Sequence, residues 1–252
     1  MAVSTSPQWG NVPPHCRSKR TSHINVMLKK LNRRINRWKF KRSVRKLRNT
    51  EFCLVANNCF GSRIYKILGR EYNTPFVGLL LMPECFAKLV ADFDGYMDQN
   101  IRFINNSKYP LHRKARRGEG LYPLGLLGDL EIHFLHYKSE EDALDAWERR
   151  KARMNREHLY FILIANGPCD ETVMAQFIGQ DSSKKVCFHR QKNLETPGCI
   201  YIPSKKEHMG NLYSQYQRFV GRFDFAEWIM NRNPEIGRQR KQVRLVESDT
   251  CR

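Results

Sequence analysis

The sequence has no apolar run long enough to cross a membrane, and its first twenty residues lack the apolar core typical of a secretion leader. A spanning helix needs about 20 consecutive apolar residues. The opening stretch is polar, with Pro13-Pro14 where a leader would have its apolar core. We therefore expect a cytoplasmic protein that is neither transmembrane nor exported by that route. With 252 residues, 41% of them hydrophobic, the chain is long enough for one sizeable core.

Several motifs that identify common enzyme classes are also absent. The chain has no Walker phosphate loop, Rossmann glycine fingerprint, paired zinc spacing or H-E-x-x-H sequence. Its eight cysteines form no C-x-x-C pair, and several lie inside apolar runs, which is typical of buried thiols in a reducing compartment. We expect no metal and no tightly bound cofactor.

Acidic residues are missing from one long segment. Residues 17–48 hold fourteen Lys or Arg and no Asp or Glu, whereas residues 49–237 hold 25 basic and 23 acidic residues. The net charge of +19 therefore belongs mainly to an appendage. Apolar residues recur in it at three- and four-residue intervals, which predicts a basic amphipathic helix over residues 23–48. They are Ile24, Met27, Leu28, Leu31, Ile35 and Trp38.

Three interpretations of this basic helix are open. It could lie on an anionic membrane surface, with Trp38 and Phe40 entering the bilayer and the cations facing phosphates. It could pack on its own domain, or it could bind nucleic acid nonspecifically. No nucleic-acid module accompanies the charge, so nucleic acid is the unfavoured partner. The cations that would face the lipid are Lys29, Lys30, Arg33, Arg34 and Arg37.

The rest of the chain alternates predicted strands with predicted helices. The strands fall at 52–56, 74–81, 129–136, 158–166, 185–189 and 199–202. The helices fall at 62–68, 83–99, 139–154, 170–178, 206–219 and 223–230. This alternation predicts an α/β fold with a mainly parallel sheet and helices on both faces. The predicted organisation is a disordered tail (1–22), the basic helix (23–48), an α/β domain (49–236) and a basic tail (237–252). Within the α/β domain, residues 105–120 are predicted to form an exposed basic loop.

The turn between the first strand and helix carries a cysteine, Cys59. A helix start presents free N–H groups and the positive end of the helix dipole, which stabilise a thiolate. Asn57 and Gly61 occupy positions two before and two after it, where the nucleophile elbow of α/β-hydrolases has small residues. Cys59 is therefore the candidate nucleophile.

The same turn could instead bind substrate without a reactive sulphur. The N–H groups of Phe60, Gly61 and Ser62, with the amides of Asn57 and Asn58, could hold a phosphate. A purely structural turn is the third interpretation.

The predicted strand at 129–136 supplies the candidate acid and base groups. Its two-residue period places Asp129, Glu131 and His133 on one side. His133 is the candidate base and the carboxylates would orient it. A solvated polar edge is the alternative, and His136, on the other side, is expected in the core.

Long motifs in the chain resemble a known family. They are NNCFG at residue 57, YPLGLLGDLEIHFLHY at residue 122 and KVCFH at residue 185. They are similar to bacterial exopolysaccharide biosynthesis proteins within a domain family of unknown function, over roughly residues 51–202. The resemblance implies an α/β fold and work in capsule or exopolysaccharide assembly, beside other polysaccharide-assembly enzymes.

These features together predict a transferase docked at the inner membrane, acting on an activated sugar or a lipid-linked glycan. The donor would be a nucleotide sugar or a coenzyme A thioester. Acyl transfer would use Cys59 as nucleophile and His133 as base; glycosyl transfer would use Asp129 or Glu131. The first alternative hypothesis is a non-catalytic membrane-associated scaffold or regulator. The second alternative is a nucleic-acid-binding protein.

Overall fold

The computed structural model describes most of residues 15–232. The gaps are 111–121, 167–168, 180, 193, 195, 205 and 207, and side chains are described from residue 24 onward. The two ends of the chain, 1–14 and 233–252, and most of the predicted loop at 105–120 lie outside the described residues.

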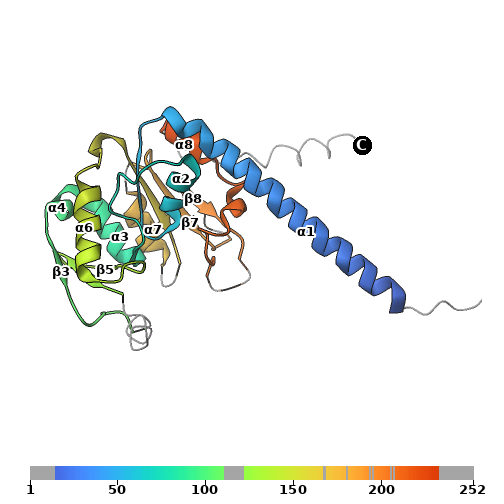
Figure 1. Cartoon of the computed structure of the whole chain (residues 1–252), viewed down its shortest axis with the longest axis horizontal. Helices are drawn as coiled ribbons and strands as arrows, with labels where there is room; N and C mark the ends of the chain where they lie inside the picture. Colours follow the sequence, from blue (N-terminus) through green and yellow to red (C-terminus); the bar gives the residue numbers. More distant parts are fainter. Residues whose placement is uncertain are drawn as a thin grey trace, which may run out of the picture.

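A parallel sheet of four strands lies at the centre of the fold (Figure 1). In spatial order its strands are β1 (Cys53–Ala56), β6 (Leu159–Ile164), β7 (Lys185–His189) and β8 (Cys199–Tyr201). Helices α2 (Phe60–Leu68) and α8 (Phe225–Asn231) pack on one face, and α3 (Pro83–Ala91) and α7 (Glu171–Ile178) on the other. Successive strand residues enter opposite cores, so Leu54 contacts the first set and Val55 the second. The predicted α/β fold is confirmed.

A second, antiparallel sheet was not anticipated. Its order is β2 (Leu80–Leu81), β5 (Leu130–His133), β4 (Leu124–Leu127) and β3 (Ile101–Phe103). The predicted strand at 74–81 shrinks to the two residues of β2. β4 and β5 form a hairpin whose turn contains Gly128 at φ +61°, a conformation that suits glycine.

Two predicted helices differ in the structure. The one at 83–99 divides into α3 and α4 (Phe93–Met97) at Asp92, whose carboxylate accepts from the Gly95 N–H at 3.2 Å and caps α4. The one at 206–219 is wrong: the described residues there form turns and the 3₁₀ helix η3 (Tyr216–Phe219), because Gly210 at φ +74° breaks the helical path.

Helix α6 (Glu140–Lys151) lies within the predicted helix at 139–154. Ser139 caps it by accepting from the Asp142 N–H at 3.0 Å. Trp147 is buried, whereas Leu144 is 39% exposed. A short 3₁₀ helix, η2 (Arg156–His158), leads from α6 to β6.

The basic segment forms the long helix α1 (His15–Val44), which continues into the 3₁₀ helix η1 (Arg45–Asn49). It begins before the predicted boundary at residue 23. Its far end projects away from the body, as the blue ribbon in Figure 1 shows. Phe40 anchors it, since this ring is buried with its centroid 5.1 Å from that of Tyr216. None of the described helices is long and apolar enough to span a bilayer.

Candidate functional site

A cleft of about 570 Å³ opens at the carboxyl edge of the parallel sheet. One wall is the turn after β1 together with the start of α2, and a second is the segment Gly210–Tyr213 that follows β8. The third wall consists of Val77–Gly78 and Leu135–His136, which flank β2 and β5 of the other sheet. Ligands of α/β proteins collect at this edge, so the cleft is the candidate site.

The cleft combines aromatic rings with a few polar groups. Tyr72 and Tyr213 contribute rings, and Lys66 contributes an ammonium group. The Tyr213 ring is held by Arg63, whose guanidinium lies 3.8 Å from the ring centroid and whose Nε donates to the Tyr213 carbonyl at 2.9 Å. A hydrogen bond to Tyr213 raises the pKa of Lys66, so this side chain is charged at neutral pH.

Cys59 lines the cleft, but its thiol is not activated. Burial raises the pKa of the Cys59 thiol, which outweighs the hydrogen bonds that would lower it. Cys59 has φ −63° and ψ −6°, and neither Asn57 nor Gly61 has a positive φ, so the turn lacks the strained backbone of a nucleophile elbow. Gly61 has a different role, since it lets α2 approach β1 closely: a Cβ there would lie 3.1 Å from the Cβ of Ala56.

Asn57 lies behind the cleft and joins the two sheets. Its side chain is buried, and its Nδ2 donates to the carbonyls of Leu81 at 3.3 Å and Ile164 at 3.2 Å. Its Oδ1 accepts from the Ile164 N–H at 2.9 Å. The amide is therefore engaged with β2 and β6 and does not line the cleft.

Three other residues predicted to bind substrate, Asn58, Phe60 and Ser62, do line the cleft. Asn58 Oδ1 accepts from the Phe60 N–H at 3.0 Å, and Ser62 Oγ donates to the Cys59 carbonyl at 2.8 Å. The Phe60 ring points into the core, 4.7 Å from the ring of Phe219. The two hydrogen bonds shape the turn. Because the Phe60 N–H already donates to Asn58, it is not available to a substrate.

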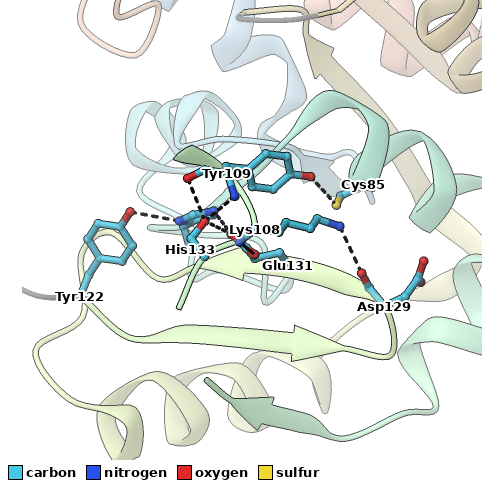
Figure 2. Close-up of polar contacts among 8 residues, drawn as sticks. Cys85, Lys108, Tyr109, Tyr122, Asp129, Glu131 and His133 are labelled. Carbon is cyan, nitrogen blue, oxygen red and sulfur yellow. Dashed lines mark hydrogen bonds and ion pairs between the residues drawn. The ribbon is translucent and has the colours of Figure 1, made fainter. Parts of the chain in front are cut away.

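Glu131 and His133 contact each other, as the strand period predicted, but far inside the protein. Glu131 Oε1 lies 2.8 Å from His133 Nε2, and the two side chains are 1% and 0% exposed. Figure 2 shows the surrounding network: Glu131 also accepts from Ser107 Oγ and from the Lys108 N–H, and Tyr122 Oη lies 3.0 Å from His133 Nδ1. Neither Glu131 nor His133 lines the cleft, so the structure does not pair His133 with Cys59.

Asp129 stands apart from that pair, in the turn before β5 (Figure 2). Its carboxylate is exposed, 2.8 Å from Lys88 Nζ and 2.7 Å from Tyr96 Oη. The hydrogen bonds from Lys88 and Tyr96 lower the pKa of Asp129. The predicted shared face of Asp129 and His133 is therefore wrong, because the strand begins only at Leu130.

The histidine that does line the cleft with Cys59 is His136. β5 ends at His133, and the chain turns so that the His136 N–H donates to the Gly78 carbonyl at 3.0 Å. The prediction that His136 lies in the core assumed that the strand continues to residue 136. Because β5 ends before that residue, the prediction is wrong, and the side chain of His136 is exposed. The cap at Ser139 was a sequence signal that a connection, not a strand, precedes α6. Nothing local marked Lys66, Tyr72 or Tyr213.

No group of three or more His, Cys, Asp and Glu side chains is placed to hold a metal ion within the part of the chain that the structure describes. These features define an α/β protein with a ligand-sized cleft at the carboxyl edge of its sheet. Residues 29–230 match the family described as a domain of unknown function, DUF1919, and the protein belongs to this family. An uncharacterized protein of Haemophilus influenzae is 28% identical over 191 residues, which is 73% of this chain and 87% of the relative.

Proposed function

We propose that the cleft is the active site of a transferase that acylates a hydroxyl of an activated sugar or lipid-linked glycan. The process would be exopolysaccharide or capsule assembly, beside other assembly enzymes at the cytoplasmic face of the inner membrane. The observation that carries the proposal is that His136, Lys66 and the start of α2 surround one cleft at the carboxyl edge of the sheet.

The lining suits a sugar that bears phosphate. The rings of Tyr72 and Tyr213 offer flat apolar faces for a sugar ring or a base. The Lys66 ammonium attracts phosphate, on either the sugar or a coenzyme A donor. A volume of about 570 Å³ falls within the range of small-molecule sites, about 300–1,000 Å³.

His136 is the base in this mechanism. The acceptor hydroxyl oxygen attacks the thioester carbonyl carbon of the donor while His136 takes the hydroxyl proton. The N–H groups at the start of α2 stabilise the resulting oxyanion. The carbon–sulphur bond then breaks, and the leaving thiolate receives the proton from His136. Cys59 forms no covalent bond in this scheme, because its thiol stays protonated.

The lining favours acyl transfer over glycosyl transfer. Glycosyl transfer was expected to use Asp129 or Glu131, and neither lines the cleft; nor does any other acidic side chain of the described residues. Direct acyl transfer needs a base and an oxyanion site and no carboxylate.

The test is acetyl transfer from acetyl-coenzyme A to a panel of nucleotide sugars, with the acetylated sugar detected by mass spectrometry. We expect product with the wild type, and His136→Asn lowers kcat by about 10²–10⁴-fold with little change in KM. His158→Asn, which changes a histidine outside the cleft, is the matched control and keeps the wild-type rate. Undiminished kcat in His136→Asn would remove that residue from the mechanism, and absence of any acetylated product would reject the reaction.

A non-catalytic scaffold for polysaccharide-assembly enzymes is the second candidate. The observation that favours it is the row of exposed apolar side chains on α1, which a scaffold would use to hold its partners. Under this hypothesis the cleft binds nucleotide sugar without turnover, which calorimetry with UDP-glucose would detect in the absence of any product.

A further inference from the structure

The projecting part of α1 carries an apolar stripe that the body does not cover. Met27 is 70% exposed and Trp38 is 55% exposed. Monomeric proteins rarely leave so many large apolar side chains in water along one helix. The members of the stripe are Ile24, Met27, Leu28, Leu31, Ile35 and Trp38.

The stripe is a separate face of α1 and not an extension of the face that packs on the body. At about 100° per residue, Leu28 and Ile35 lie on one side of the helix and Phe40 and Val44 lie on the opposite side. Phe40 and Val44 are buried in the core. The body therefore cannot reach the stripe, and another surface is needed to cover it.

Two residues that the sequence assigned to lipid belong to the body. The Phe40 ring is 3% exposed among core aromatic rings. Arg37 Nη2 donates to the Ser214 carbonyl at 3.2 Å, and its Nε donates to Gln217 at 3.4 Å. The surface available for docking is therefore residues 24–38 without Arg37.

A second copy of this chain is the first partner to consider. The spacing of residues 24, 28, 31, 35 and 38 alternates four and three, which is the seam of a coiled coil. The positions beside such a seam would be Asn25, Met27, Asn32, Arg34, Lys39 and Lys41, and residues 17–48 contain no acid to pair with the three cations among them. Two such helices would repel each other where these cations meet.

The same charges are complementary to an anionic lipid surface. Lys30, Arg34 and Lys39 are exposed beside the stripe, whereas Lys29 and Arg33 lie on the opposite side of the helix. The Arg42 guanidinium lies 5.3 Å from the Trp38 ring centroid, so a cation sits beside the aromatic ring of the stripe. Cations near an anionic bilayer favour binding, and the apolar side chains enter the interface.

We propose that residues 24–38 of α1 dock in the plane of an anionic lipid bilayer, with the stripe facing the acyl chains. The proposal does not depend on the reaction in the cleft. A lipid-docked arm would hold the body at the surface where lipid-linked glycans are found.

The test is sedimentation of the full chain with vesicles of phosphatidylcholine alone or with about one third phosphatidylglycerol. We expect binding to the anionic vesicles only, and its loss in about 0.5 M NaCl. Leu28→Ser with Leu31→Ser weakens that binding by at least about tenfold. Val26→Ser, also exposed but on the side opposite the stripe, changes it by less than about twofold. His136→Asn binds like the wild type, which separates docking from catalysis.

Three results would overturn the proposal. The first is equal binding to neutral and anionic vesicles, or none to either. The second is dimerisation in analytical ultracentrifugation that Leu28→Ser with Leu31→Ser abolishes, since a second copy would then occupy the stripe. The third is binding to duplex DNA that competes fully with vesicles and survives the same double substitution.

Discussion

The side-chain amide of Asn57 forms two hydrogen bonds with the backbone of Ile164, more than one hundred positions away in the chain. Nδ2 donates to the Ile164 carbonyl at 3.2 Å, and Oδ1 accepts from the Ile164 N–H at 2.9 Å. A third bond, to the Leu81 carbonyl, reaches the antiparallel sheet. One amide therefore fixes β1, β6 and β2 together at the floor of the cleft.

Replacing Asn57 should destabilise the protein strongly. Asn57→Ala leaves three buried backbone groups without these partners, and we expect a loss of about 2–4 kcal/mol in the free energy of unfolding. Asn58→Ala, which removes only the bond to the Phe60 N–H, should cost about 1 kcal/mol. Urea denaturation measures both. Equal losses for the two variants would contradict the structural role of Asn57.

Glu131 should matter for stability and not for ligand binding. Glu131→Gln removes the buried charge that faces His133, and we expect a loss of about 3 kcal/mol. Asp129→Asn, at an exposed ion pair with Lys88, should cost less than about 1 kcal/mol. Thermal unfolding gives both values, and calorimetry with acetyl-coenzyme A should show the wild-type Kd in each variant. Loss of binding in folded Glu131→Gln would place this residue in the site after all.

The pH dependence of alkylation tests the state of Cys59. Because burial raises the pKa of this thiol, its reaction with iodoacetamide should be slow near neutral pH. The rate should still rise above about pH 9.5, where that of an ordinary thiol with a pKa of about 8.5 levels off. Peptide mass spectrometry follows the residue, with Cys59→Ser as the blank. A rate that is already constant below about pH 8 would restore the nucleophile hypothesis.

Alkaline stability should report on Cys53 in β1. Burial raises the pKa of this thiol to about 12 from a usual value of 9.0. The folded protein keeps a proton that the unfolded chain releases above its own pKa. The stabilisation is therefore complete at neutral pH and is lost as the pH rises from about 9 toward 12, by up to about 1.4 kcal/mol per pH unit for this one group.

The matched variant for this effect is Cys53→Ala. It should be less stable at neutral pH because of the cavity, but its free energy of unfolding should fall less steeply with pH than that of the wild type. Urea titrations between about pH 8 and 10 measure the difference in slope. Parallel curves for the two proteins would show that Cys53 does not hold its proton in this range.

The parallel sheet could be predicted from sequence because its strands are continuous apolar runs and two of the helices on it, α7 and α8, begin with side-chain caps. β6 and the capped start of α7 at Asp170 are examples. The antiparallel sheet could not be predicted, since β2 and β3 contain two and three residues and show no usable period.

The candidate site followed from sequence only in part. The turn at Cys59 was found because a strand meets a helix there, and the contact of Glu131 with His133 followed from alternation along β5. The position of His136 depends on the residue at which β5 ends, a boundary that local pattern does not define. Tyr213 enters the cleft from a loop far along the chain, placed by Arg63 on α2.

Arg37 on α1 donates to the carbonyl of Ser214, and Ser214 is the immediate chain neighbour of Tyr213 in the cleft wall. The long helix α1 is thus attached to one wall of the cleft, and the residue to which it is attached directly follows Tyr213 in the chain. The Phe40 ring contacts Tyr216, so α1 meets the segment that follows Tyr213 through both a hydrogen bond and a ring contact. A partner that holds α1 is therefore connected to the cleft wall through these two contacts.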